Sequence, residues 1–382
     1  MTTVMTDEMQ QMKTMIRNFV EKAVEPCAQQ IEEEDAIPQH LVEQAKALGL
    51  FGISIPEEYG GIGLNTVEKA NVLEQLGRTH NGFVSLISAH TGIGSTGLVK
   101  LASEYLKNKY LPDMAAGNKI AAFALSEPGA GSDATNLATR AEKKGDHWVM
   151  NGTKHFITNG PIADVFTVFA LTDKEKGAKG GITAFLLEKS FPGLIIGKKD
   201  KKMGLRGSYT SQLIFEDCMI PEENVIGQVG MGYMSALKIL GEGRVGLAAR
   251  AVGSCDKLIE LSAQYAKERI QFGKPIADNQ AIQWMLADMA TETEAARTLT
   301  MMAAQKIDEG KKVIKEASMA KLFASDVFNR VADKAVQIHG GMGYVSDYPV
   351  ERFYRDARIT KIYEGTNEIQ RLIIARNVLQ EA

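Results

Sequence analysis

Apolar residues follow two different periods along this chain, and the changes between them divide it into three parts. From the N-terminus to about residue 118, apolar residues recur every three or four positions, which predicts helices joined by short loops. The opening segment predicts an amphipathic helix, and further helices are predicted to begin after Ile37-Pro38 and at Thr66. We therefore expect a helical N-terminal domain over residues 1–118.

Helical spacing ends near Lys119, and short strand-like segments replace it up to about residue 229. The segments are 120–125, 148–150, 154–158, 165–171, 183–187 and 212–215. Asn151-Gly152 stands between two of them, and this dipeptide between alternating segments predicts a tight hairpin turn. We expect residues 119–229 to form a β domain with antiparallel connections.

Helical spacing returns at Gly230, and the predicted helices are longer than those of the first part. They cover about 232–268, 279–309, 313–339 and 367–380, with glycine-containing breaks between them. The order of helices, strands and helices predicts an α+β multidomain protein, with residues 230–382 as a C-terminal helical domain. A chain of 382 residues is long enough for two or three domains.

Composition and charge argue against several classes of partner. The formal net charge is −3, so the chain offers no general attraction to nucleic acid or to an anionic membrane. No apolar run reaches transmembrane length, and the N-terminal segment lacks the continuous apolar core of a signal peptide. Cys27, Cys218 and Cys255 are far apart and lack metal-ligand spacing, which favours reduced cysteines in the cytoplasm and no metal site.

The candidate chemistry lies at the start of the last predicted helix, in the segment 363–370. Asn367, with Gln370 three residues later, matches an N-cap and its capping-box partner. Glu364 would then lie just outside a helix N-terminus, beside Gly365, where free N–H groups can hold an anion or a polarised oxygen. A Glu at this place also complements the helix dipole without any catalytic role, so this motif alone leaves both interpretations open.

The glycine-rich segment 129–134 satisfies the dinucleotide-binding pattern G-x-G-x-x-G/A. Pro128 and the strands that follow, in place of a long crossover helix, argue against a Rossmann fold. The segment is either a loop whose N–H groups cradle a phosphate or a plain connection. Phe156 and Thr158 are two residues apart in a predicted strand, so both side chains should lie on one face, which suits a flat ring system with polar edges.

These segments occur together in an order and at a spacing that resemble the acyl-CoA dehydrogenase family. Residues 123–133 (FALSEPGAGSD) resemble its first signature, and residues 337–343, with Asp347 and Arg352, resemble the second. The family pattern is also similar at 202–208, at Arg269-x-x-Phe272-Gly273 and at 363–366. The resemblance extends from about residue 5 to the C-terminus. It implies an N-terminal helical domain, a middle β domain and a C-terminal four-helix bundle.

The resemblance further implies that FAD and a CoA thioester bind in a cleft between the β domain and the bundle. The matching positions around the flavin and the thioester are Phe123, Leu125, Ser126, Gly131 and Ser132, with Phe156 and Thr158 against the isoalloxazine ring. Positions that resemble those holding the pyrophosphate and adenosine across a subunit interface are Arg269, Phe272, Gln280, Gln337, Gly340 and Gly341. Thr366, Asn367 and Glu368 match a further FAD contact. A homotetramer is implied as well.

Glu364 is implied as the catalytic base, because most family members carry the base in the Tyr-Glu-Gly-Thr element. A minority place it immediately before an Arg of a bundle helix, and that position here is Gly243, before Arg244. We do not expect Glu242 to replace it, since a shift of one residue turns a helical side chain by about 100°. Gly241 stands where an Asp that helps to hold CoA is frequent. The positions that match substrate contacts are Ser132, Gly243, Arg244 and Gly365.

The implied function is FAD-dependent α,β-dehydrogenation of a short- to medium-chain acyl-CoA to trans-2-enoyl-CoA, with electrons passed to an electron-transferring flavoprotein. Gly243 and the compact 363–366 element resemble the short-chain, butyryl-type members. Branched acyl groups stay open, because one methylene in an apolar pocket changes binding by only about 1–3 kcal/mol. A carrier-protein thioester would need a basic cleft mouth, and a dicarboxylyl-CoA would need a cation deep in the acyl pocket. A non-catalytic flavin-binding member is a further alternative, against which the intact Glu364 and Thr158 argue.

Overall fold

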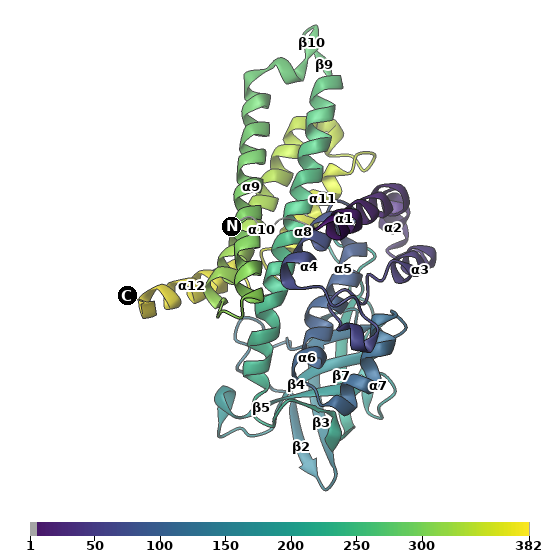
Figure 1. Cartoon of the computed structure of the whole chain (residues 1–382), viewed down its shortest axis with the longest axis vertical. Coiled ribbons are helices and arrows are strands. Elements are labelled where there is room, and N and C mark those ends of the chain that lie inside the picture. The colour runs from purple at the N-terminus through teal and green to yellow at the C-terminus, as the bar shows by residue number, and fades with distance from the viewer. Residues whose placement is uncertain (1–5, 382) are drawn as a thin grey trace.

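The computed structural model describes residues 6–381, and these form three parts in chain order (Figure 1). The N-terminal part is helical and contains α1 (Asp7–Phe19), α2 (Ala28–Glu34), α3 (Gln39–Ala47), α4 (Thr66–Leu76), α5 (Asn81–Ala89), α6 (Ser95–Leu101) and α7 (Glu104–Ala115). The helices predicted after Ile37-Pro38 and at Thr66 are α3 and α4. Both hydrogen bonds of a capping box between Asn65 and Glu68 begin α4, which explains its sharp start.

The middle part is a single sheet of eight strands within the described residues, in the order β6-β7-β3-β2-β4-β5-β8 with β1 beside β4. The strands are β1 (Ala121–Ala124), β2 (Arg140–Lys144), β3 (His147–Thr158), β4 (Val165–Leu171), β5 (Ile182–Glu188), β6 (Leu194–Ile196), β7 (Thr210–Pro221) and β8 (Val225–Ile226). The prediction of antiparallel connections is wrong for β1 and β2, which both pair parallel with β4. The long connection through β2 and β3 lets the chain return in the same direction.

The predicted hairpin turn at Asn151-Gly152 is also wrong, because β3 runs straight through this dipeptide. The turn lies earlier, at Gly145, between β2 and β3. Asn151-Gly152 instead marks a bulge, where the register between β3 and β7 shifts and Asn151 exchanges hydrogen bonds with Asp217. Gly152 has a φ of 143°, and a Cβ there would stand 2.6 Å from the Cα of Thr139, so only glycine fits.

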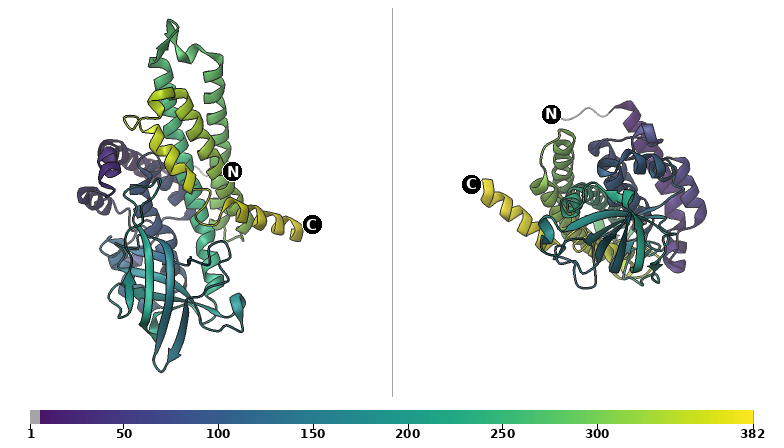
Figure 2. Two further views of the ribbon diagram at one scale, coloured as in Figure 1. Left: turned by 180° about the vertical axis from the view of Figure 1, so that it is seen from behind. Right: turned by 90° about the horizontal axis from the view of Figure 1, so that it is seen from below.

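The C-terminal part consists of long helices that lie side by side, with one helix departing from them (Figures 1 and 2). Its elements are α8 (Gly232–Glu268), the hairpin β9 (Ile270–Gln271) and β10 (Lys274–Pro275), α9 (Gln280–Asp308), α10 (Ile314–His339), α11 (Val350–Ile359) and α12 (Asn367–Glu381). The bounds predicted for α8, α9, α10 and α12 agree to within one residue, whereas α11 was not predicted. Helix α12 projects from the body of the molecule (Figure 2). The predicted fold of helical, β and helical parts is confirmed.

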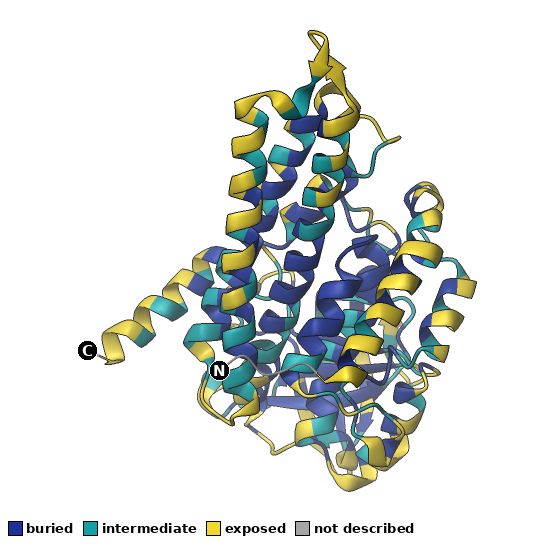
Figure 3. Cartoon of the chain, turned by 45° about the horizontal axis from the view of Figure 1, so that its top comes forward, coloured by how far each residue is buried: buried dark blue, intermediate teal, exposed yellow. Residues whose placement is uncertain are grey.

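The first and last parts share one hydrophobic core, in which α4 packs closely on α8. A Cβ at Gly253 of α8 would stand 1.9 Å from the carbonyl oxygen of Glu74, and a Cβ at Gly77 would stand 2.2 Å from that of Arg250. The two glycines therefore allow the backbones to touch. The length of α8 that faces α4 is buried, whereas α9 is exposed along its outer side (Figure 3). No helix among residues 6–381 is long and apolar enough to cross a membrane.

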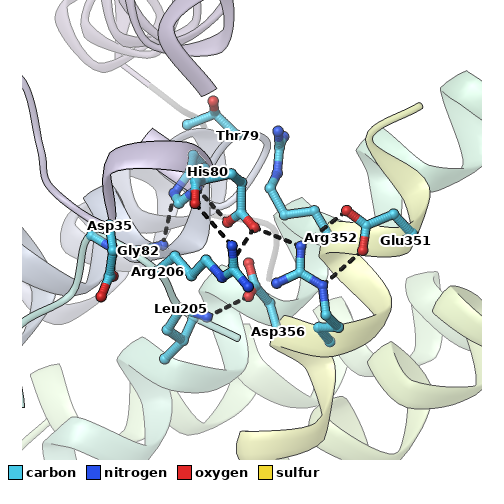
Figure 4. Close-up of polar contacts among 12 residues, drawn as sticks. Asp35, Thr79, His80, Gly82, Leu205, Arg206, Glu351, Arg352 and Asp356 are labelled. Carbon is cyan, nitrogen blue, oxygen red and sulfur yellow. Dashed lines mark hydrogen bonds and ion pairs between the residues drawn. The ribbon is translucent and has the colours of Figure 1, made fainter. Parts of the chain in front are cut away.

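A buried polar network of Glu32, His80, Arg355, Asp356 and Leu205 joins all three parts (Figure 4). Glu32 of α2 accepts hydrogen bonds from His80, at 2.9 Å, and from Arg355 of α11, at 2.6 Å. Asp356, the next residue of α11, accepts from the N–H of Leu205 in the middle part at 2.6 Å. Because α11 leads directly into the turn that carries Glu364, this network fixes where the turn begins.

Candidate active site

Glu364 lies in the short turn between α11 and α12, and its backbone has an uncommon conformation. Glu364 and Gly365 both have positive φ, 55° and 88°. Such a φ costs a non-glycine residue on the order of 1–2 kcal/mol, so neighbouring groups must hold it in place. Gln370 Nε2 donates to both carbonyl oxygens, at 3.3 and 2.9 Å, and Lys321 Nζ donates to that of Gly365 at 2.9 Å. These contacts fix the direction in which the Glu364 side chain leaves the backbone.

The start of α12 differs from the predicted capping box of Asn367 and Gln370. The hydroxyl of Thr366 accepts from the N–H of Ile369 at 3.3 Å, so Thr366 is the N-cap. The Asn367 amide is buried and bonds to three polar side chains of α10: Lys321, Ser325 and Asp326. Its hydrogen-bonding capacity is therefore used inside the chain, which gives Asn367 the role of holding the turn on α10 and does not support a side-chain contact with FAD.

One oxygen of the Glu364 carboxylate, Oε2, is buried and has no hydrogen-bond partner among residues 6–381. Burial raises the pKa of this carboxyl above its ordinary value, and the charges of Arg250, Lys321 and Arg244 offset part of the rise. The backbone N–H of Glu364 donates to no other described residue. A carboxylate of raised pKa beside a free N–H can take a proton from a carbon acid while the N–H binds the oxygen that becomes negative.

Gly243 of α8 lies directly against this carboxylate. A Cβ at position 243 would stand 2.6 Å from Oε2 of Glu364 and 2.9 Å from Cγ2 of Ile93, closer than side chains pack. The glycine therefore makes room for Glu364, and no second carboxylate can stand at position 243 beside it. A Cβ at Gly241, by contrast, would meet no atom of the described chain within 4 Å.

The Glu364 side chain lines a pocket between the N-terminal helices and α8. The other lining residues are Lys69 and Leu73 of α4, Ser88, Thr91, Gly92, Ile93, and Glu242, Gly243, Gly246, Leu247 and Arg250 of α8. The expectation that Glu242 turns away from this cleft is wrong, because Glu242 lines the pocket together with Gly243. The pocket is wide enough to reach two neighbouring faces of α8, one with Glu242 and Gly246 and one with Gly243 and Leu247. Its carboxylate forms an ion pair with Lys100.

Three buried cations hold the Glu364 turn, and the sequence analysis missed two of them, Lys321 and Arg250. Arg244 Nε donates to the Glu364 carbonyl oxygen at 3.5 Å, and Arg250 Nη2 donates to the Tyr363 hydroxyl at 3.3 Å. Arg244 thus contacts the turn within this chain, whereas its predicted contact with the substrate stays a prediction. Lys321 and Arg250 each interrupt a run of small buried residues on a helix, and this pattern was the available signal for them.

Five of the predicted flavin or thioester positions come from β1 and the loop that follows it. The side chains of Phe123 and Leu125 are buried, Ser126 is half-buried, and Gly131 and Ser132 are exposed. A buried ion pair anchors this loop, since Lys154 Nζ donates to Glu127 Oε1 at 2.7 Å and to the Leu125 carbonyl oxygen at 3.0 Å. No crossover helix follows β1, so the structure agrees with the exclusion of a Rossmann fold.

Phe156 and Thr158 lie at the end of β3, where the strand is irregular. The prediction that they share a face assumed regular alternation, and this assumption is wrong, because Phe156 has a φ of 59° and lies in a register shift between Lys154 and Ile157. The Phe156 ring is 66% exposed and stacks on His155 with their centroids 3.9 Å apart. The bulge thus exposes the aromatic ring of Phe156, two residues before Thr158 in the sequence.

The remaining predicted cofactor positions are exposed. Glu368 is the second residue of α12, and the other six lie at the far end of the bundle: Arg269, Phe272, Gln280, Gln337, Gly340 and Gly341. Tyr265 stacks on His339 with centroids 4.4 Å apart, which joins the ends of α8 and α10. Figure 1 shows the β9–β10 hairpin and the β domain at opposite ends of the molecule. A single copy therefore does not bring the two sets of predicted cofactor positions together.

The fold and this site define an enzyme that can take a proton from a carbon acid, and comparison with known proteins identifies it as a flavin-dependent oxidoreductase. Three family models match in succession: the N-terminal domain of acyl-CoA dehydrogenase over residues 6–118, the middle domain over 122–218 and the C-terminal domain over 230–379. The chain belongs to the acyl-CoA dehydrogenase family.

Individual relatives cover nearly the whole chain. An acyl-CoA dehydrogenase of Bacillus subtilis is 46% identical over 374 residues, which are 98% of each chain. Butyryl-CoA dehydrogenase from Megasphaera elsdenii is 40% identical, with a TM-score of 0.96 over 99% of this chain and 100% of that one. A chain from the structural study of the electron transferring flavoprotein of Acidaminococcus fermentans is 43% identical, with a TM-score of 0.97 over 100% of each chain.

FAD is the cofactor of this family, and the described residues fit it. The exposed loop at Gly131 and Ser132 offers backbone N–H groups for a phosphate, and the exposed Phe156 ring offers a surface for a flat ring. A Cβ at Gly340 or Gly341 would meet no atom within 4 Å, so open space surrounds both glycines. These features are accessible, aromatic or rich in donors, as a dinucleotide with a flavin ring requires.

Proposed function

We propose that the protein converts a short- to medium-chain acyl-CoA to the trans-2-enoyl-CoA, with Glu364 as the base and an electron-transferring flavoprotein as acceptor. The observation that carries the proposal is the Glu364 carboxylate, buried without a hydrogen-bond partner in a pocket where Gly243 leaves room for it. A carboxylate that only complemented a helix dipole would have no need of this enclosed space.

The chain's own groups supply the proton chemistry in this proposal. Glu364 removes the α-proton, and its raised pKa brings it closer to the weakly acidic carbon. The free N–H of Glu364 binds the thioester oxygen, which stabilises the negative charge that develops there. Bound FAD supplies the acceptor for the hydride from the β-carbon. The pocket walls exclude water and thereby strengthen both interactions.

The chain length and the acceptor are supported by similarity. The butyryl-CoA dehydrogenase of M. elsdenii is named for a four-carbon acyl group, and one neighbour comes from a study of an electron transferring flavoprotein. Apolar side chains such as Leu73 and Leu247 line part of the pocket between α4 and α8, which suits the methylene groups of an acyl chain. We propose that the protein is a homotetramer with FAD bound between copies, because the predicted cofactor positions lie at opposite ends of the molecule. We propose a cytoplasmic location as well.

Anaerobic titration of the purified yellow protein tests this function. Acyl-CoA thioesters from C4 to C16, with isobutyryl-CoA and isovaleryl-CoA, are added while the flavin absorbance is followed, and turnover is measured with a dye and with oxygen. We expect bleaching by the shorter thioesters, rapid dye reduction and little peroxide. Peroxide formed as fast as the dye is reduced would indicate an oxidase, and a protein that takes up no flavin would be a non-catalytic member.

A further inference from the structure

Lys69 of α4 is a charged residue in a pocket where an apolar acyl chain would need none. It lines the same pocket as Glu364 and is only 7% exposed. Leu73, one turn further along α4, lines the pocket beside it. Buried lysines are rare in proteins unless a partner compensates the charge.

No such partner is present among residues 6–381. Lys69 Nζ has no hydrogen bond and no ion pair with any described residue, and only charges at a distance act on it. Glu242, the acidic group that faces it across the pocket, is already paired with Lys100. Asp308 also acts on Lys69 electrostatically, but its two oxygens accept the N–H groups of Thr66 and Val67 at the start of α4. Lys69 is left as a cation without a direct partner.

An uncompensated ammonium in such a place disfavours an apolar ligand. Because the charged form of Lys69 loses solvation when it is buried, its pKa is lowered, and the charge of Glu242 offsets only part of this. An alkyl chain would remove the remaining water from the ammonium and give nothing in return. A carboxylate would instead form a charge-assisted hydrogen bond with it.

We propose that Lys69 determines specificity by pairing with a carboxylate at the distal end of the acyl group, so that the preferred substrate is a short dicarboxylyl-CoA. This inference rests on the proposed function, since it assigns the acyl end of the same pocket. It concerns binding of the acyl group and adds no step to the reaction.

Matched thioesters test the inference in the wild-type protein. Succinyl-CoA, glutaryl-CoA and adipyl-CoA are compared with butyryl-CoA, pentanoyl-CoA and hexanoyl-CoA, which have the same chain lengths without the carboxylate. Binding is measured by calorimetry with Glu364→Gln, which is expected to reduce its flavin at least on the order of 10²-fold more slowly than wild type, and kcat/KM is measured with wild type. We expect at least one dicarboxylyl thioester to bind and react about 10-fold better than its partner. Tighter binding of every monocarboxylyl thioester would overturn the inference.

Substitution of the lysine tests its role directly. Lys69→Met keeps the length of the side chain without the charge, and it should remove this preference of about 10-fold, because a hydrogen bond to a charged group contributes at least about that much. Lys69→Gln serves as a second variant should Lys69→Met not fold. Lys13→Met is the matched control, because Lys13 contacts Asn71 of the same helix at 3.1 Å outside this pocket. An unchanged ratio in both Lys69 variants would contradict the inference.

The two proposals fail in different ways. If no thioester bleaches the flavin of wild type but the calorimetric preference for the carboxylate is present and depends on Lys69, the proposed reaction is wrong and the assignment of Lys69 holds. If monocarboxylyl thioesters bleach the flavin and Lys69 has no effect on the preference, the reaction holds and the assignment of Lys69 is wrong.

Discussion

At the scale of single residues, the site depends on the space of one methyl group. Glu364 adopts a left-handed backbone conformation, and its carboxylate occupies the volume that a side chain at Gly243 would need. We predict that Gly243→Ala lowers the rate of flavin reduction by at least about 10-fold, because the new Cβ would stand 2.6 Å from Oε2 and displace it. Stopped-flow reduction by the best thioester measures the effect.

Gly241→Ala is the control for this substitution on the same helix. A Cβ at position 241 meets no described atom within 4 Å, and alanine favours a helix over glycine by about 1 kcal/mol. Gly241→Ala should therefore keep the rate and raise the melting temperature slightly. Equal rates in the two variants would show that the carboxylate does not occupy the position assigned to it.

At the scale of elements, α10 controls the Glu364 turn through Lys321. Lys321 Nζ bonds to the carbonyl oxygen of Gly365 and to Asn367 at 2.9 and 2.8 Å, and its charge lowers the pKa of Glu364. Lys321→Met should reduce kcat and raise the pKa of Glu364, and because only the ionised carboxylate is a base, activity should rise at higher pH than in wild type. The pH profile of kcat/KM checks the direction. Lys315→Met changes another lysine of α10 and removes its ion pair with Glu381 of α12, and it should leave the profile unchanged.

The elements also show where sequence patterns are sufficient and where they are not. The long helices were predicted to within one residue, because a helix depends on local spacing and on Gly breaks such as Gly310. Asn151-Gly152 was misread as a turn, because the same dipeptide suits a bulge once a distant strand, β7, pairs across it. Lys321 and Lys69 were not singled out, since their importance follows from burial by other helices. Glu364 was found through its motif, but its unpartnered oxygen appears only in the structure.

At the scale of the whole molecule, the network of Figure 4 links the stability of the three parts to pH. Burial alone would raise the pKa of Glu32, but hydrogen bonds from His80 and Arg355 outweigh it and lower the pKa from 4.5 to about 2. The folded-state pKa lies below the unfolded one, so this stabilisation is complete above pH 4.5 and is lost as the pH falls towards 2. Glu32→Gln should reduce the free energy of unfolding at pH 7 by on the order of 1–3 kcal/mol and weaken its pH dependence in this range.

Denaturant unfolding between pH 2 and 7 measures this effect. Glu34→Gln is the control, because Glu34 is exposed and, among residues 6–381, accepts a hydrogen bond only from Gln30 on its own helix. A Glu32→Gln protein as stable as wild type at pH 7 would show that the network does not hold the parts together.

We predict that assembly and FAD retention depend on Phe272, at the end of the molecule opposite the β domain. Phe272 is fully exposed at the tip of the β9–β10 hairpin with a φ of 51°, and in the tetramer proposed above it would contact FAD that is bound between copies. Phe272→Ala should keep its secondary structure but lose FAD during gel filtration and elute as smaller species. Tyr105→Ala, which removes another exposed aromatic ring, should elute like wild type. A Phe272→Ala protein with full flavin content and unchanged size would contradict assembly through this end.

The central claim is that Glu364 is the base, and flavin reduction in Glu364→Gln tests it most directly. Gln has nearly the same shape and keeps the turn, but it cannot accept the proton. The variant should stay yellow and bind an enoyl-CoA product, whereas its reduction by substrate should be slower by on the order of 10²–10⁴-fold. Glu368→Gln, exposed four residues further on, should affect FAD retention more than this rate. Bleaching of Glu364→Gln within a few-fold of the wild-type rate would contradict the account.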